Sequence, residues 1–207
     1  MKRVFIHGTG HGAESWNGTV SRMESGGNIL CPELGAILDG KEASYTNLYS
    51  AFVEYCGRVE GPLGLCGLSL GGVLALNYAL DYPDRVGSLA LIGTPHRVPK
   101  LAFAVQNLVF RFMPEAAFKG MAFGKRDTFA LTNSLKGLDL SGRAGEVRCP
   151  TLVVCGEKDS VNMKAARFFA QSIRGAELRI IEGAGHVVNE EKPEALARAL
   201  DEFYGAY

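Results

Sequence analysis

The sequence has no charge excess, no closely paired cysteines and no long apolar run. Its 22 Lys and Arg residues balance 22 Asp and Glu residues. This balance argues against a dedicated nucleic-acid-binding protein, because such proteins usually carry a basic excess. The five cysteines are irregularly spaced and include no C-x-x-C pair. We therefore expect buried thiols in a reducing compartment rather than disulfides.

Targeting and membrane signals are also missing. Only three apolar residues follow the two charged residues after Met1, which is too short a run for a signal peptide. No apolar stretch approaches the roughly 20 residues that cross a bilayer. These absences predict a cytoplasmic protein without a membrane span. The 207 residues, 47% of them apolar, predict one globular domain with room for an insertion.

Short apolar segments alternate with helical patterns along most of the chain. The segments are typical of strands buried on both faces, and they cover residues 3–7, 28–32, 63–66, 86–92, 151–155 and 177–181. The helical patterns cover residues 15–24, 46–59, 70–81, 162–172 and 193–204. This alternation predicts an α/β fold, with a parallel sheet between two layers of helices.

The alternation stops between residues 95 and 148, where only helical patterns are found. We expect a helical cap there, inserted into a core made of residues 1–94 and 149–207 and lying over the carboxyl ends of the strands. The segment from 96 to 148 has a net charge of +5 and six of the eleven phenylalanines fall between 95 and 148. Phe103 is our candidate for an apolar substrate contact.

The strongest chemical signal is the pentapeptide G-L-S-L-G at residues 67–71. It matches G-x-S-x-G, the nucleophile elbow, and it lies between a predicted strand and a predicted helix as that motif requires. In such a tight turn the serine is expected at positive φ, and the flanking glycines avoid clashes that a Cβ would cause. Ser69 is therefore the candidate nucleophile.

A serine hydroxyl needs a base, and the chain has only four histidines. His7 and His11 precede Ser69, whereas in elbow enzymes the base follows the serine and the acid. His96 has no acid at a strand end between it and the serine. His186 follows the last predicted strand, and the small residues before it would let its ring approach Ser69. His186 is the candidate base.

The acid should orient the imidazole and stabilise its charged form. Asp159 follows the strand 151–155 directly and is our candidate. Glu157 lies in the same loop, and the spacing alone does not exclude it. The other aspartates between serine and histidine lie at a helix end or within the expected cap; they are Asp81, Asp84, Asp127 and Asp139.

A loop of sequence H-G-T-G at residues 7–10 follows the first strand. A tetrahedral intermediate needs two backbone N–H donors aimed at its oxyanion. The residue after the nucleophile, Leu70, supplies one of them, and the first strand-to-helix loop supplies the other. We expect Thr9 to be the second donor, with Gly10 as the alternative.

The same loop fits two other patterns. One is a dinucleotide-binding fingerprint, formed by Gly8, Gly10, Ala13 and Glu33. No Tyr-x-x-x-Lys pair for dehydrogenase chemistry accompanies it. The other is an H-x-x-x-H spacing, but two glycines between His7 and His11 argue against the helix that would aim both at zinc. We expect a structural His7, a pocket-lining His11 and no metal.

Together these motifs resemble the α/β-hydrolase family over nearly the whole chain. The shared features are His-Gly, Trp16, G-x-S-x-G-G, G-x-x-D and Gly-His, and they are most similar to small capped esterase-like members. The resemblance implies an α/β-hydrolase fold with a mostly parallel six-stranded sheet of order 2-1-3-4-5-6. That sheet lacks the two strands which the family places before the His-Gly strand. The resemblance implies no cofactor.

We therefore predict a serine hydrolase that cleaves a small apolar or anionic acyl ester through Ser69, His186 and Asp159. Its partner is a small-molecule substrate. A non-catalytic ligand-binding protein on the same scaffold is the first alternative. A dinucleotide-dependent oxidoreductase is the second.

Overall fold

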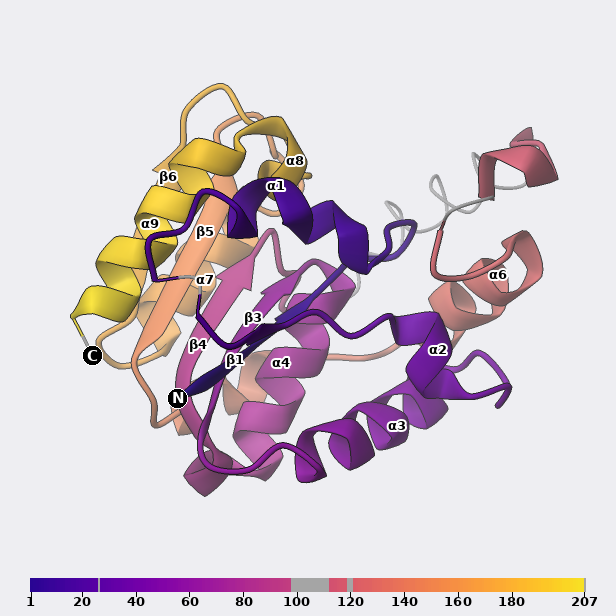
Figure 1. The fold of residues 1–207 in the computed structure, drawn as a ribbon, viewed down its shortest axis with the longest axis horizontal. Helices are drawn as coiled ribbons and strands as arrows, with labels where there is room; N and C mark the ends of the chain where they lie inside the picture. Colours follow the sequence, from indigo (N-terminus) through magenta and orange to yellow (C-terminus); the bar gives the residue numbers. More distant parts are fainter. Residues whose placement is uncertain (26, 98–111, 119–120, 207) are drawn as a thin grey trace.

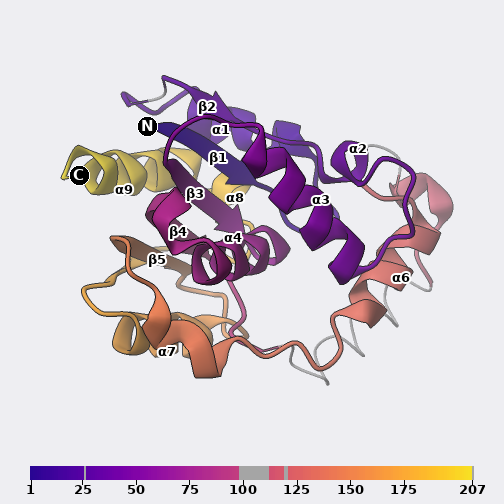
Figure 2. The same cartoon turned by 90° about the horizontal axis from the view of Figure 1, so that it is seen from below.

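Six parallel strands form one sheet in a computed structural model that describes residues 1–25, 27–97, 112–118 and 121–206. The strand order is β2-β1-β3-β4-β5-β6, which confirms the predicted order. Figure 1 labels β1 and β3 to β6, and Figure 2 shows β2 beside β1. The strands are β1 (Lys2–Ile6), β2 (Ile29–Leu30), β3 (Leu63–Leu68), β4 (Val86–Ile92), β5 (Thr151–Gly156) and β6 (Glu177–Ile181).

Helices cover both faces of the sheet. Helices α3 and α4 lie on one side of the central strands and α9 lies on the other (Figure 2). The α-helices are α1 (Asn17–Val20), α2 (Leu34–Leu38), α3 (Tyr45–Gly57), α4 (Leu70–Asp81), α6 (Lys125–Ser134), α7 (Met163–Ser172), α8 (Val188–Glu191) and α9 (Pro193–Gly205). The 3₁₀ helices are η1 (Ala13–Trp16), η2 (Pro83–Arg85), η3 (Glu115–Phe118) and η4 (Ser141–Glu146).

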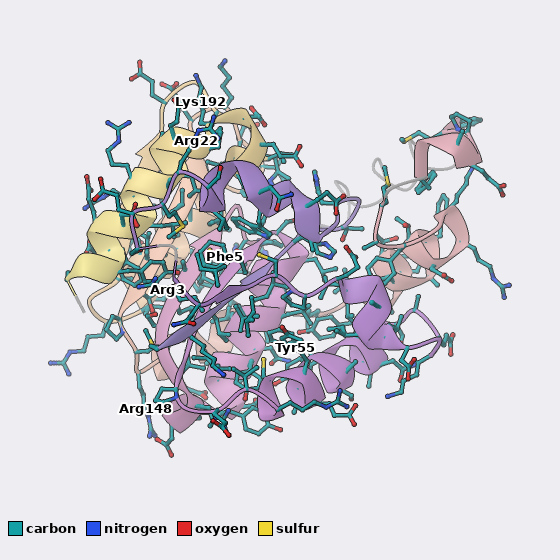
Figure 3. The ribbon with its side chains drawn as sticks, in the orientation of Figure 1. Arg3, Phe5, Arg22, Tyr55, Arg148 and Lys192 are labelled. Atoms are coloured by element: carbon teal, nitrogen blue, oxygen red, sulfur yellow. The ribbon has the colours of Figure 1, made fainter. Side chains whose placement is uncertain are left out.

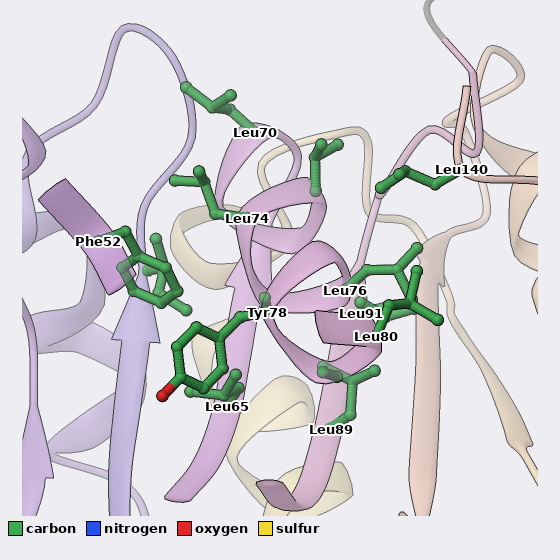
Figure 4. Close-up of a cluster of buried hydrophobic side chains, with 14 of the residues drawn as sticks. Phe52, Leu65, Leu70, Leu74, Leu76, Tyr78, Leu80, Leu89, Leu91 and Leu140 are labelled. Carbon is green, nitrogen blue, oxygen red and sulfur yellow. The ribbon is translucent and has the colours of Figure 1, made fainter. Parts of the chain in front are cut away.

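Successive strand residues point to opposite faces, so each strand contributes to two cores. In β1, Val4 and Ile6 pack with the α3 and α4 side, whereas Phe5 packs with the α9 side. Phe5 lies in the interior, while Arg148 and Lys192 lie on the outer surface (Figure 3). Figure 4 shows the core under α4, which includes Phe52, Leu65, Leu74, Leu76, Tyr78, Leu89 and Leu91.

Strand β2 is shorter than the predicted segment 28–32. It contains only two residues, because Asn28 has a left-handed φ of 64° at one end and Pro32 has no N–H to continue the ladder at the other. The pattern of apolar residues alone predicts neither the left-handed backbone at Asn28 nor the end of the strand before Pro32. The short strand still places the following loop beside β1.

The predicted helix 15–24 is also wrong in length. It is divided into η1 and α1, and it ends at Val20. The chain then turns, and the Asp201 carboxylate accepts hydrogen bonds from the backbone N–H groups of Glu24 and Ser25 at 2.9 and 3.0 Å. A partner 177 residues away in the sequence therefore fixes this turn, and local propensity could not reveal it.

Three cysteines are buried as predicted, whereas Cys31 and Cys149 are half-buried; all five are free thiols. Between β4 and β5, the described residues form η3, α6 and η4 and add no strand to the sheet. Phe103 lies outside the described residues. Among the phenylalanines of this segment, Phe123 packs in the core and Phe112 is 79% exposed. No helix in the described part is long and apolar enough to cross a membrane.

Candidate active site

Ser69 lies at the junction of β3 and α4 in a strained backbone conformation. Its φ is 53° and its ψ is −112°, a region that residues with a Cβ rarely occupy. Its backbone N–H donates to the carbonyl oxygen of Ile92 at 2.9 Å, which ties the turn to the end of β4. The residue is half-buried, so its hydroxyl lies near the surface of the fold at the carboxyl edge of the sheet.

The glycines of the elbow are required by close backbone contacts. A Cβ on Gly71 would lie 2.1 Å from the carbonyl oxygen of Ile6 in β1. A Cβ on Gly67 would lie 2.3 Å from the carbonyl carbon of Gly71. Real Cβ atoms do not come this close to backbone atoms, so side chains here would push α4 away from the sheet. The glycine spacing of the motif therefore has a direct structural cause.

The His186 ring contacts the Asp159 carboxylate. Its Nδ1 lies 2.7 Å from Asp159 Oδ2. The acid side chain is 4% exposed and the histidine side chain 40% exposed, so the pair leads from the interior to the surface. Burial alone would raise the pKa of Asp159, but hydrogen bonds from His186 and Asn162 outweigh it, and the pKa is lowered. Asp159 is thus an ionised acceptor for a protonated Nδ1.

Glu157, the other acid that spacing left open, faces a different group. Its Oε2 accepts a hydrogen bond from the Gly183 backbone N–H at 2.9 Å. Glu157 and Asp159 both hold the loop that carries His186, but only Asp159 contacts the ring. Asn162 was missed from the sequence, because the nucleophile-elbow pattern assigns no role to the residue three positions after the acid.

Ser69 and His186 both lie beside the end of β4, although no direct hydrogen bond joins their side chains. A Cβ on Gly93, the residue after β4, would lie 3.0 Å from His186 Nδ1. The residue before it, Ile92, binds the Ser69 backbone. Hydrogen bonds between nucleophile and base are often long before substrate binds. The structure therefore brings the predicted serine, histidine and aspartate to one edge of the sheet.

The loop after β1 runs beside the elbow. A Cβ on Gly8 would lie 3.4 Å from the Ser69 Cβ. The His11 N–H donates to the Gly8 carbonyl at 3.3 Å, and Gly10 has a φ of 84°. These features describe a β-turn with Thr9 and Gly10 at its centre, and its third position requires a positive φ. Thr9 thus lies in a loop that contacts the nucleophile.

Helix α4 begins directly after Ser69. Leu70 is its first residue, so its N–H has no acceptor within the helix. An N–H at a helix N-terminus also lies at the positive end of the helix dipole. Leu70 is therefore placed where a developing negative charge would be stabilised.

His7 is fully buried and is engaged with backbone groups on both sides. Its Nδ1 lies 2.9 Å from the Gly8 carbonyl oxygen, and the Leu34 N–H donates to Nε2 at 3.1 Å. The Leu34 N–H can donate only to an unprotonated Nε2, which places the proton of a neutral ring on Nδ1; the Glu33 Oε1 atom also lies 3.2 Å from Nε2. Burial lowers the pKa of His7, in agreement with that state. The ring supports the loop after β1 from beneath.

His11 joins three parts of the molecule. Its Nδ1 lies 3.3 Å from Glu190 Oε1 in α8, and its carbonyl accepts from the Ala122 N–H at 3.2 Å. Next to it, Met121 Sδ would lie 3.9 Å from a Cβ on Gly10. Residues 121–122, from the segment between β4 and β5, therefore rest on the loop after β1.

Glu33, which suggested a dinucleotide site, faces the same loop. Its Oε2 accepts from the Ala13 N–H at 2.9 Å. Two members of the fingerprint are thus bonded to each other, and the carboxylate fixes the entry to η1. Across the described residues, no group of three or more His, Cys, Asp or Glu side chains forms a potential metal site.

Comparison with known proteins places this fold in a family. The model of the alpha/beta hydrolase family matches residues 4–199. Monoacylglycerol lipase abhd6-B of Xenopus laevis is 24% identical, with 97% of this chain and 74% of the relative covered. The 2-hydroxy-6-oxononadienedioate/2-hydroxy-6-oxononatrienedioate hydrolase of Klebsiella pneumoniae is 29% identical, with 97% and 85% covered.

Among solved structures, the enol-lactonase of Burkholderia xenovorans LB400 superposes with a TM-score of 0.80 at 17% identity, covering 99% of this chain and 91% of the other. The chain therefore belongs to the alpha/beta hydrolase family and is a hydrolase. This assignment overturns the oxidoreductase alternative.

Proposed function

We propose that this hydrolase cleaves carboxylic esters through an acyl-enzyme, with Ser69 as nucleophile, His186 as base and Asp159 as the acid that orients it. The observation that carries the proposal is the 2.7 Å contact between His186 and a buried, ionised Asp159, at the same end of the sheet as a strained serine that follows β3. A hydrolase scaffold needs no such arrangement to bind a ligand.

The proposed reaction has two halves. Ser69 Oγ attacks the ester carbonyl carbon while His186 Nε2 takes its proton, and the oxyanion is held by the N–H groups of Leu70 and Thr9. The intermediate collapses, His186 protonates the departing alkoxide and an alcohol leaves. Water then attacks the acyl-enzyme with His186 again as base, and the carboxylic acid is released as Ser69 recovers its proton.

Labelling with a fluorophosphonate probe tests the nucleophile. We expect the wild-type protein to become covalently labelled, and Ser69→Ala to lose both labelling and ester hydrolysis. Ser21→Ala removes an exposed hydroxyl outside the proposed site and should retain both. Absence of labelling in folded wild-type protein would refute the serine mechanism.

We propose further that the segment 95–148 acts as a cap and that the preferred substrates are small esters with an apolar acyl group. Residues 121–122 rest on the loop that carries Thr9, so the acyl group of a bound ester would meet this segment. Monoacylglycerols and enol-lactones, named for two of the similar proteins, are both carboxylic esters. An anionic acyl group is the second candidate, because the segment from 96 to 148 has a net charge of +5.

A series of p-nitrophenyl esters from two to sixteen carbons tests the acyl group. Each added methylene that is buried should raise kcat/KM up to roughly fourfold, since its burial contributes about 0.8 kcal/mol. The rise should stop at medium length, where the space under a small cap is filled. A flat profile would contradict an apolar acyl site. Comparing an anionic and a neutral ester at low and high salt tests whether the positive charge of the segment attracts substrate. Salt screens this attraction, so it should lower the rate for the anionic ester only.

A further inference from the structure

Asn162 contacts both members of the proposed acid–base pair. It precedes α7, three residues after Asp159, and it is buried, with 7% of its surface exposed. The loop 157–162 turns so that its side-chain amide returns to the Asp159 carboxylate. Nothing in the nucleophile-elbow pattern requires an amide at this position.

Both carboxylate oxygens of Asp159 accept from Asn162. The side-chain Nδ2 lies 3.0 Å from Oδ1 and 2.9 Å from Oδ2, and the backbone N–H donates to Oδ1 at 3.1 Å. His186 Nδ1 completes the set at Oδ2. A carboxylate held by several donors has one orientation and favours the ionised state.

The amide also lies close to the imidazole. Asn162 Nδ2 is 3.2 Å from His186 Nδ1. While Nδ1 carries its proton, both nitrogens are donors and converge on the same oxygen of Asp159. The amide would bond to the ring only if Nδ1 had lost its proton. An anionic Asp159 is therefore what keeps both donors pointing at the carboxylate.

We propose that Asn162 is a positioning residue of this hydrolase, whose side-chain amide keeps the Asp159 carboxylate ionised and directed at His186. The inference rests on the proposed function, since it assigns Asn162 a part in the action of the same pair. The lowered pKa of Asp159, with Asn162 among its causes, agrees with this role.

Among the residues that the structure describes, two titratable groups lie beside Asp159. The ring of His186 is one. The other is Cys155 at the end of β5, whose Sγ lies 3.9 Å from the Asp159 carbonyl oxygen. Burial raises the pKa of the Cys155 thiol to about 12, so it stays neutral in a neutral assay. At the end of the neighbouring strand β4, the residue that faces Asp159 is Gly93, which has no titratable side chain. The ionisation of Asp159 is therefore controlled by Asn162 and His186.

The test replaces Asn162 by leucine, which is similar in size and keeps the backbone N–H but has no side-chain donor. We expect kcat on a p-nitrophenyl ester to fall roughly tenfold to a hundredfold, the effect of losing a hydrogen bond to a charged group. KM should stay within about twofold, because Asn162 does not face the substrate in the proposed reaction. On the acidic side of the profile, the pH at which kcat/KM falls to half should be higher by roughly one pH unit.

A second variant keeps the inference testable if the leucine protein does not fold. Asn162→Asp keeps the size of the side chain and replaces the donor with a second carboxylate, so it should move the acidic side of the profile at least as far upward. Asn189→Ala is the control. Asn189 is a buried asparagine whose amide donates to the Ser15 carbonyl, and its loss should lower stability without moving the profile.

The outcomes separate this inference from the proposed function. Retained activity in Asp159→Asn would refute the catalytic assignment itself. If Asp159→Asn is inactive, but folded Asn162→Leu or Asn162→Asp keeps the wild-type kcat and pH profile, then the hydrogen bonds of Asn162 to Asp159 are only structural and the inference is overturned.

Discussion

Replacing Ser69 by glycine should make the protein more stable than replacing it by alanine. Ser69 has a φ of 53° and a ψ of −112°, which glycine adopts readily and residues with a Cβ do not. A residue held in such a conformation costs on the order of 1–3 kcal/mol. Alanine keeps the Cβ and therefore the strain, whereas glycine releases it.

The expected difference follows from two opposing effects. Glycine releases the strain, but it gives the unfolded chain more freedom, which lowers the free energy of unfolding by about 0.4–1 kcal/mol. The free energy of unfolding of Ser69→Gly should therefore be roughly 1–2 kcal/mol higher than that of Ser69→Ala. In a domain of this size, that difference corresponds to roughly 2–8 °C in Tm.

Thermal and urea unfolding of both variants provide the measurement, and neither variant should react with the fluorophosphonate. Ser50, exposed in the middle of α3, supplies the matched pair. There glycine should be less stable than alanine by about 1 kcal/mol, the ordinary helical difference. The sign should thus reverse between the two sites. If glycine is also the less stable residue at position 69, no strain is stored at the nucleophile.

Three further predictions concern the acid and the elbow. Asp159→Asn should lower kcat by on the order of 10⁴, because His186 then adopts the wrong tautomer. Glu157→Gln should lower kcat less than about tenfold, since it loses only part of a backbone contact; a reversed order would identify Glu157 as the acid. Gly71→Ala should lower the free energy of unfolding by about 3 kcal/mol or more or prevent folding, whereas Gly57→Ala, with nothing within 4 Å of its Cβ, should raise it by up to about 1 kcal/mol; equal Tm values would contradict the contact. Because the pKa of Asp159 is lowered in the folded protein, its ionised carboxylate stabilises the folded state above the unfolded pKa of about 3.9, and this stabilisation is lost as the pH falls through the folded pKa. The difference in urea stability between wild type and Asp159→Asn should therefore shrink below about pH 4. A constant difference would refute the linkage.

The strands and the elbow could be predicted because their causes are local. All six predicted segments became strands with bounds no more than two residues from the expected ones, since buried parallel strands are apolar along their whole length. The serine turn was predictable because its glycines avoid backbone clashes that this tight turn would cause for any residue with a Cβ. The apolar segments and the glycine spacing are both visible directly in the sequence.

The choice of acid and its partner depended on the direction of side chains, which spacing does not contain. Glu157 and Asp159 lie two residues apart, yet one binds Gly183 and the other His186. Asn162 became visible only once the turn brought its amide back to Asp159. In the same way, α2 was missed because it is a single short helix with a glycine at its second position.

The proposed chemistry and the proposed substrate choice depend on different parts of the chain. Ser69, Asp159 and His186 are held by hydrogen bonds and close contacts among the strand ends of the core. The described part of the segment 95–148 reaches this region through residues 121–122, and Met121 faces the loop beside the serine. Met121→Ala should therefore change KM and the preferred acyl length while leaving the pH profile in place. A shift of that profile would instead show that the segment takes part in the ionisation of the catalytic groups.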